Sequence, residues 1–106
     1  MKIKDYRGVD IIVYPRLFDH VERRHPDVLQ VLNIRNKYDL YDVLKNILGG
    51  PHEVYKDREG TYYYIRRLND IFITAIVYDN VVRTMYLLSN KNYCRMRSKR
   101  WVYKVY

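Results

Sequence analysis

The chain has 106 residues, enough for one compact core and too few for two, so we expect a single domain over residues 1–106. It carries 20 Lys and Arg against 12 Asp and Glu, and the resulting charge of +8 attracts polyanions, which makes nucleic acid the first partner to consider. A single cysteine excludes an internal disulfide framework and a cysteine-based zinc site, and no apolar run is long enough for a membrane span or a signal peptide, so we expect a cytoplasmic protein without membrane contact.

The first half of the chain predicts a hairpin followed by helices. Strand-like runs at 2–6 and 10–14 flank Arg7-Gly8-Val9, which has the composition of a turn. From Pro15 the apolar residues recur at helical spacing, and Pro26 disfavours helix at the residue before it, so a helix should end near position 24 or 25. Residues 27–34 extend this region by a further helical turn or two. Asp39 resembles the N-cap of a longer helix that ends at Gly49-Gly50-Pro51.

After residue 51 the apolar period falls from about 3.6 to 2. Four strand-like runs at 53–56, 61–68, 71–78 and 81–88 are separated by turn formers, which predicts an antiparallel meander. The run at 71–78 is apolar at nearly every position, so it should lie centrally with both faces covered. Residues 91–99 look basic and irregular, and 101–106 alternate like a last strand. The expected fold is α+β, with two to three N-terminal helices packed on a curved antiparallel sheet that combines the meander and the N-terminal hairpin.

The predicted first helix carries the densest polar group in the sequence. His20 and Arg24 are four residues apart, which places them on one face of a helix, and His25 lies at its end. Imidazole can move the proton of a ribose hydroxyl, and guanidinium can hold a phosphate, so this pairing suits phosphodiester cleavage. The alternative is a solvated helix face on which His25 only caps the helix end.

The second polar group lies on the predicted strands. Alternation sends Tyr62, Tyr64 and Arg66 to one face of the sheet and Tyr63 and Arg67 to the other. Aromatic rings beside a cation are typical of single-stranded RNA recognition, because the rings stack on bases and the cation binds phosphate. The alternative is that the tyrosines only cover a sheet of high β-propensity.

The third group is the C-terminal extension, 91–106, which holds six basic residues and no acidic one. Such a segment either follows an RNA backbone or is a solvated tail. The sequence has no His-Glu-x-x-His motif, and its carboxylates are scattered among turns and caps, so we expect neither a metal nor a cofactor.

Several of these segments together resemble a known family. They are Asp19-His20-Val21-Glu22-Arg23-Arg24-His25-Pro26-Asp27, Gly50-Pro51-His52-Glu53-Val54-Tyr55, Tyr62-Tyr63-Tyr64 and Val82-Arg83-Thr84-Met85-Tyr86. Over about residues 10–90 the chain is similar to the phage-associated nucleases of the barnase, EndoU, colicin and RelE superfamily. The resemblance implies helices on a curved sheet, RNA across the open sheet face, and metal-independent cleavage by attack of the ribose hydroxyl on the adjacent phosphate.

The resemblance also implies roles for particular residues. The candidate catalytic residues are His20, Arg24, His25, Arg66, Thr84 and Tyr86. The aromatic and basic pattern of the strands and of the C-terminal extension, apart from the resemblance, gives the candidate RNA-binding residues Tyr62, Tyr64, Arg67, Ser89, Lys91, Arg95, Arg97, Lys99 and Arg100. The expected function is a toxin-like or phage-related endoribonuclease, with an acidic antitoxin or immunity-type protein as a further possible partner. The alternative functions are a non-catalytic RNA-binding module and a partner-binding protein that use the same basic, Tyr-rich face.

Overall fold

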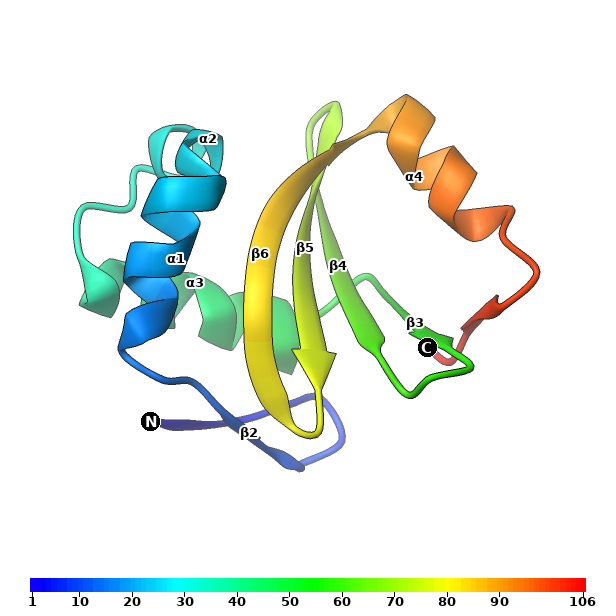
Figure 1. Ribbon diagram of the computed structural model, residues 1–106, viewed down its shortest axis with the longest axis horizontal. Helices are drawn as coiled ribbons and strands as arrows, with labels where there is room; N and C mark the ends of the chain where they lie inside the picture. The colour runs from blue at the N-terminus through cyan, green and yellow to red at the C-terminus, as the bar shows by residue number, and fades with distance from the viewer.

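Seven strands form one sheet in the order β1-β2-β6-β5-β4-β3-β7 in the computed structural model, which describes residues 1–106 (Figure 1). The strands are β1 (Lys2–Lys4), β2 (Asp10–Ile12), β3 (Glu53–Asp57), β4 (Tyr62–Leu68), β5 (Ile71–Tyr78), β6 (Val81–Ser89) and β7 (Val102–Lys104). The helices are α1 (Arg16–Arg24), α2 (Pro26–Val31), α3 (Lys37–Gly49) and α4 (Asn90–Arg97). The class is α+β, as the sequence predicts.

Strands β3 to β6 pair antiparallel in chain order, and β5 is the central strand of the sheet. The turn between β5 and β6 is formed by Asp79 and Asn80, whose φ angles are 53° and 58°. Positive φ at both central positions matches the twist of a two-residue hairpin, and Asp and Asn tolerate that conformation better than other non-glycine residues. The meander predicted from the turn formers is therefore present.

The sheet is mixed rather than wholly antiparallel. β1 and β2 form the expected N-terminal hairpin, but β2 pairs parallel with β6 at Ile12 and Val81. The chain leaves β2 through three helices before it returns as β3, so β2 meets β6 without a hairpin turn to fix an antiparallel direction. β7 adds to the opposite edge, antiparallel to β3.

Helices α1, α2 and α3 cover one face of the sheet, which we call the inner face. Its residues include Tyr64, Ile73, Ala75 and Met85, and they belong to the larger of two apolar cores. Leu17 and Val21 of α1 enter the same core at helical spacing. The opposite, outer face carries Tyr63, Ile65, Thr74 and Tyr86, as alternation along β4, β5 and β6 requires.

α3 begins two residues earlier than its expected cap. Asn36, not Asp39, is the N-cap, and its side-chain oxygen accepts hydrogen bonds from the backbone N–H groups of Tyr38 and Asp39 at 3.0 Å. Asp39 instead accepts from the backbone and side chain of Arg35. Both residues are good caps, and the prediction chose the wrong one of the two.

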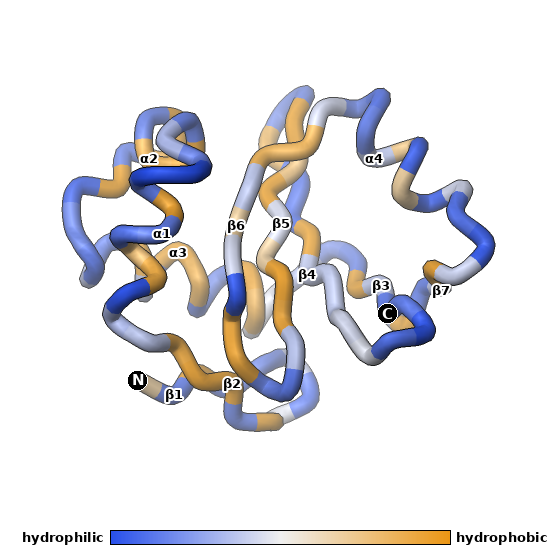
Figure 2. Tube along the Cα trace, in the orientation of Figure 1, coloured by the Kyte–Doolittle hydropathy of each residue, from blue (hydrophilic) through white to orange (hydrophobic).

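The segment predicted as an irregular tail forms α4. Ser89 caps its N-terminus by accepting a hydrogen bond from the Asn92 N–H at 3.2 Å. Tyr93 and Met96 are buried three residues apart against Ile65, Phe72 and neighbouring side chains, which make up the second core. Figure 2 shows how hydrophilic α4 and the loop after it are, and this explains why the sequence pattern hides the helix. One end of the outer face is therefore covered.

None of the four helices has both the length and the apolar character that a membrane-spanning helix requires.

Candidate functional site

His20 and Thr84 meet where α1 lies beside β6 (Figure 1). The His20 Nε2 lies 2.9 Å from the Thr84 Oγ1, a hydrogen-bond distance, although the two residues are 64 positions apart in the chain. Leu17 and Val21 hold α1 in the inner core, and this fixes the face of the helix on which His20 projects. The contact turns the imidazole toward the outer face of the sheet, where Thr84 and Tyr86 are both partly buried.

His25 and Tyr86 extend this group. The His25 and His20 ring centroids are 6.2 Å apart, and the His25 and Tyr86 centroids are 5.7 Å apart. His25 occupies the break between α1 and α2, where Pro26 begins the second helix and the chain changes direction. The structure thus brings together four of the six candidate catalytic residues, from the middle of α1, the junction of α1 and α2, and β6.

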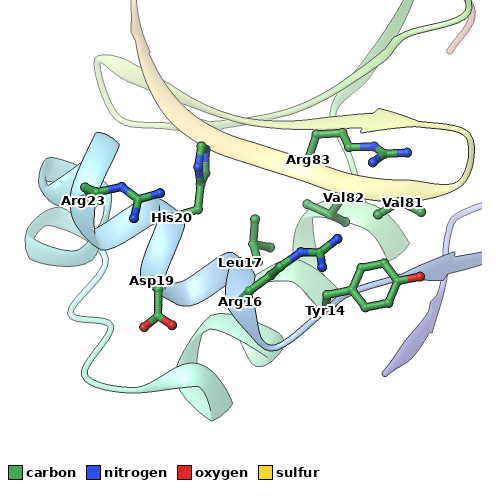
Figure 3. Close-up of a pocket in the computed structure, with 9 residues that line it drawn as sticks. All are labelled: Tyr14, Arg16, Leu17, Asp19, His20, Arg23, Val81, Val82 and Arg83. Carbon is green, nitrogen blue, oxygen red and sulfur yellow. The ribbon is translucent and has the colours of Figure 1, made fainter.

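A cavity of about 430 Å³ opens beside His20 (Figure 3). Three arginines line it: Arg16 and Arg23 from α1, and Arg83 from β6. All three are exposed, and none forms an ion pair. Asp19, the one carboxylate in the lining, points away from β6 in Figure 3. Arg83 donates from its Nε to the Tyr78 carbonyl at 3.2 Å. The cavity therefore places three guanidinium groups without carboxylate partners and one imidazole around a space that can hold an anion.

The same surroundings act on the pKa of His20. Burial lowers it below its ordinary value of 6.5, and the positive charges of His25, Arg23 and Arg24 lower it further. Both causes disfavour the charged imidazolium. At neutral pH the His20 ring is neutral, and when Nε2–H donates to Thr84 the lone pair lies on Nδ1 and can accept a proton.

Arg66 does not join this group. It lies on the inner face, where its guanidinium donates to the carbonyl of Gly50 after the end of α3. The prediction that Arg66 is a catalytic residue together with His20 is therefore wrong, because the strand alternation directs Arg66 and Tyr86 to opposite faces of the sheet. Arg24 is exposed near the end of α1, and its charge is close enough to act on the His20 pKa, but it is not among the residues lining the cavity.

Tyr62 and Tyr64 also lie on the inner face. Tyr64 is fully buried and donates to the buried carboxylate of Asp5 at 2.7 Å. Tyr62 packs against the same core and lies under the Arg7 guanidinium, 5.1 Å from its ring centroid. These two rings anchor the N-terminal hairpin to β4. The prediction that Tyr64 stacks on bases is wrong, because its ring is fully buried, while Tyr62 is partly exposed but lies on the face opposite Tyr86.

Tyr63 and Tyr86 are among the aromatic residues of the outer face. They line a second cavity, of about 330 Å³, between the sheet and α4, together with Arg95 and Lys99. Tyr63 donates to Asp57 at 3.1 Å, and burial together with this hydrogen bond raises the pKa of Tyr63 to about 12. Tyr86 thus has His25 on one side and the second cavity on the other.

The remaining candidate RNA-binding residues fall into two groups. Arg67 and Arg97 line a third cavity on the other flank of α4, while Lys91 and Arg100 are exposed at the surface without ion pairs. Ser89 is engaged as the cap of α4. No three His, Cys, Asp or Glu side chains come together in a group that could hold a metal ion.

Arg16, Arg23 and Arg83 are not among the site residues predicted from the sequence. Arg16, His20 and Arg23 are spaced by four and three residues, which puts them on one helix face and is a signal that was available. Arg83 gave no such signal. It falls at a register irregularity, where β5 and β6 shift between Ile76 and Val77 and leave Arg83 without a partner in the ladder.

Comparisons with known proteins find no matching family, no similar curated protein and no similar solved structure.

Proposed function

We propose that the protein is an endoribonuclease that cleaves RNA at the outer face of its sheet, between α1 and β6. The observation that carries this proposal is the grouping of His20, His25, Thr84 and Tyr86, with unpaired arginines beside it. Two imidazoles at this separation can act on the two oxygens that exchange at one phosphorus atom. The resemblance to the barnase, EndoU, colicin and RelE nucleases agrees with this function and is part of the proposal.

In the proposed reaction, neutral His20 accepts the proton of a ribose 2′-hydroxyl. The 2′-oxygen then forms a bond to the adjacent phosphorus, and the bond from phosphorus to the 5′-oxygen breaks. The imidazolium form of His25 donates a proton to the departing 5′-oxygen, so the products are a 2′,3′-cyclic phosphate and a 5′-hydroxyl. No metal ion takes part in this scheme, because the chain supplies both the base and the acid.

The other groups stabilise the transition state or position the reacting groups. Charge accumulates on the non-bridging phosphate oxygens in the transition state, and Arg16, Arg23 and Arg83 are the guanidinium groups at hand to bind it. These three take the place of Arg66 in the proposed site. Thr84 holds the His20 ring through its hydrogen bond, and Tyr86 offers an aromatic face beside His25 for a base.

Cleavage of an end-labelled single-stranded RNA in buffer with EDTA tests the proposal. The wild-type protein is expected to give fragments with cyclic phosphate and 5′-hydroxyl ends. His20→Ala and His25→Ala should each lower the rate by about 10²- to 10⁴-fold, the usual contribution of a general acid or base. Arg35→Gln is the control, because Arg35 lies away from the site and is paired with Asp39.

RNA binding without any cleavage would overturn the catalytic proposal and favour the non-catalytic RNA-binding module instead. Cleavage that survives in the His20→Ala, His25→Ala double variant would show that other residues carry the reaction. Cleavage that depends wholly on added divalent metal would contradict the mechanism. A binding partner such as an acidic antitoxin would act on the same basic surface.

A further inference from the structure

A third cavity, of about 490 Å³, lies on the flank of α4 that faces away from Tyr86 and the second cavity. Its floor is formed by Ile65 and Phe72, and Phe72 stacks on Tyr93 with the ring centroids 4.0 Å apart. Its polar lining consists of His52, Glu53, Arg67, Asn90 and Arg97. It shares no residue with the cavity beside His20.

Two arginines, Arg67 and Arg97, line this cavity without an ion pair. The Arg67 guanidinium lies 5.9 Å from the centroid of Phe72, and the Arg97 guanidinium lies 5.4 Å from that of Tyr93. Because Phe72 and Tyr93 are stacked on each other, the two cations are held beside one rigid aromatic pair. Arg67 is further fixed by a hydrogen bond from its Nε to the Asn69 carbonyl.

His52 adds a donor. Its Nδ1 accepts a hydrogen bond from the Arg67 backbone N–H at 2.8 Å. A neutral imidazole that accepts at Nδ1 carries its proton on Nε2, so the tautomer is set and Nε2–H is left to donate. The same bond ties His52, which precedes β3, to the strand that carries Arg67.

Glu53 is the only carboxylate at the cavity, and its charge is already balanced. The hydroxyl groups of Tyr55 and Tyr93 both donate to Glu53 Oε2, and Lys104 lies 3.9 Å from Oε1. Burial favours the neutral acid, but these hydrogen bonds and the nearby charges of Lys104 and Arg97 outweigh it and lower the pKa of Glu53. Glu53 therefore positions Tyr93, and the net charge around the cavity stays positive.

We propose that this cavity is a second anion site, which binds a phosphate group through Arg67, Arg97 and the Nε2–H of His52, with the Asn90 amide as a further polar contact. Guanidinium pairs and a fixed imidazole donor match the tetrahedral arrangement of phosphate oxygens, and the Phe72 and Ile65 floor suits an attached apolar or aromatic group. The phosphate belongs either to a free mononucleotide or to an RNA strand. The site does not depend on the proposed cleavage, because none of its residues touches His20 or His25.

The test follows the side-chain resonances of His52 and Asn90 by NMR during titration at pH 7. The probes are inorganic phosphate, a nucleoside 5′-monophosphate and a 2′-O-methyl oligoribonucleotide that cannot be cleaved. We expect saturable shifts of both residues. Arg67→Gln/Arg97→Gln should weaken this binding about tenfold or more, because two charge-assisted hydrogen-bonding groups are lost. Saturation by the monophosphate alone assigns a free nucleotide, and saturation by the oligonucleotide alone assigns the strand.

The matched control is Arg35→Gln/Lys45→Gln, which removes the same charge from the region of α3 and should leave the shifts at His52 within about twofold of wild type. An amide spectrum of each variant that matches the wild-type spectrum away from the substitutions establishes that the fold is retained. Shifts that grow without saturation, or equal loss of binding in both double variants, would overturn the proposal and indicate only a general attraction to anions. His20→Ala/His25→Ala should bind inorganic phosphate at this cavity as wild type does, so a failure of the cleavage proposal is separable from a failure of this one.

Discussion

His20 is the residue on which the proposed chemistry depends. Its ring is held by Thr84 from another part of the chain and surrounded by positive charge from its own helix. The pKa of an ordinary histidine is about 6.5. Because the pKa of His20 is lower, its unprotonated form, which can act as a base, predominates at neutral pH. Thr84 acts through His20 and is a positioning residue in this scheme.

The lowered pKa of His20 predicts the pH dependence of cleavage. The rising limb of kcat/KM should have its midpoint below pH 6.5, because the active form of a general base is the unprotonated one. Arg23→Gln/Arg24→Gln removes two of the charges that disfavour the imidazolium, so the midpoint should move to higher pH. The pH–rate profile of both proteins measures the shift.

His20 also makes the stability of the fold weakly dependent on pH, and stability should rise with pH as the pH approaches 6.5 from below. A histidine whose pKa is lower in the folded than in the unfolded state binds fewer protons when folded, so it stabilises the fold above pH 6.5 relative to lower pH.

A midpoint for cleavage that moved to lower pH in the Arg23→Gln/Arg24→Gln variant would contradict the electrostatic account of His20.

For single residues, the sequence predicts which residue types belong to the site better than it predicts the face of the sheet on which each side chain lies. His20, His25, Thr84 and Tyr86 were selected before any geometry, largely through a family resemblance. The choice between faces of β4 was wrong, because tyrosine and arginine occupy both faces and alternation separates the two sets without saying which set is covered.

Among the elements, α4 determines which part of the outer face of the sheet stays exposed. It covers the end of the outer face that carries Ile65, Phe72 and Leu88, and it leaves cavities on both of its flanks. β6, which carries Thr84 and Tyr86, lies between α1 and α4 (Figure 1). The helix therefore bounds the proposed RNA surface and contributes cations to it.

Substitution of Ser89 distinguishes a role in the stability of the fold from a role in RNA binding. It caps α4, so Ser89→Ala should lower the free energy of unfolding by about 1 kcal/mol, the usual cost of removing an N-cap. RNA affinity under conditions where the variant is fully folded should change by less than about twofold. Urea unfolding and an RNA-binding isotherm of the same preparation make the comparison. Unchanged stability with a large loss of affinity would instead restore Ser89 to the RNA contacts predicted from sequence.

The helix could not be predicted from periodicity. Only Tyr93 and Met96 are buried in it, and the other positions are polar or charged apart from Cys94, which is exposed. An isolated segment of this length and composition is marginal as a helix, so α4 depends on packing against a sheet whose exposed apolar patch was not visible in the sequence. The meander was predictable because its turns and its alternation are local features.

For the molecule as a whole, five basic side chains that line cavities flank the outer face on two sides. Arg16, Arg23 and Arg83 lie at the α1 side, Arg95 and Lys99 lie at the α4 side, and Tyr63 and Tyr86 lie between them. The inner face, in contrast, is closed by three helices over a continuous apolar core. Two aromatic rings thus lie between two groups of cations on the outer side of the sheet, an arrangement that suits a single strand of RNA.

The measurement that tests this arrangement most directly is a map of backbone amide shifts on addition of a 2′-O-methyl oligoribonucleotide. The account predicts that the largest shifts fall on Thr84, Tyr86 and Tyr63, with smaller ones on α1 and α4 and none along α3. Shifts concentrated on α3 and on the N-terminal hairpin, with β6 unaffected, would contradict it.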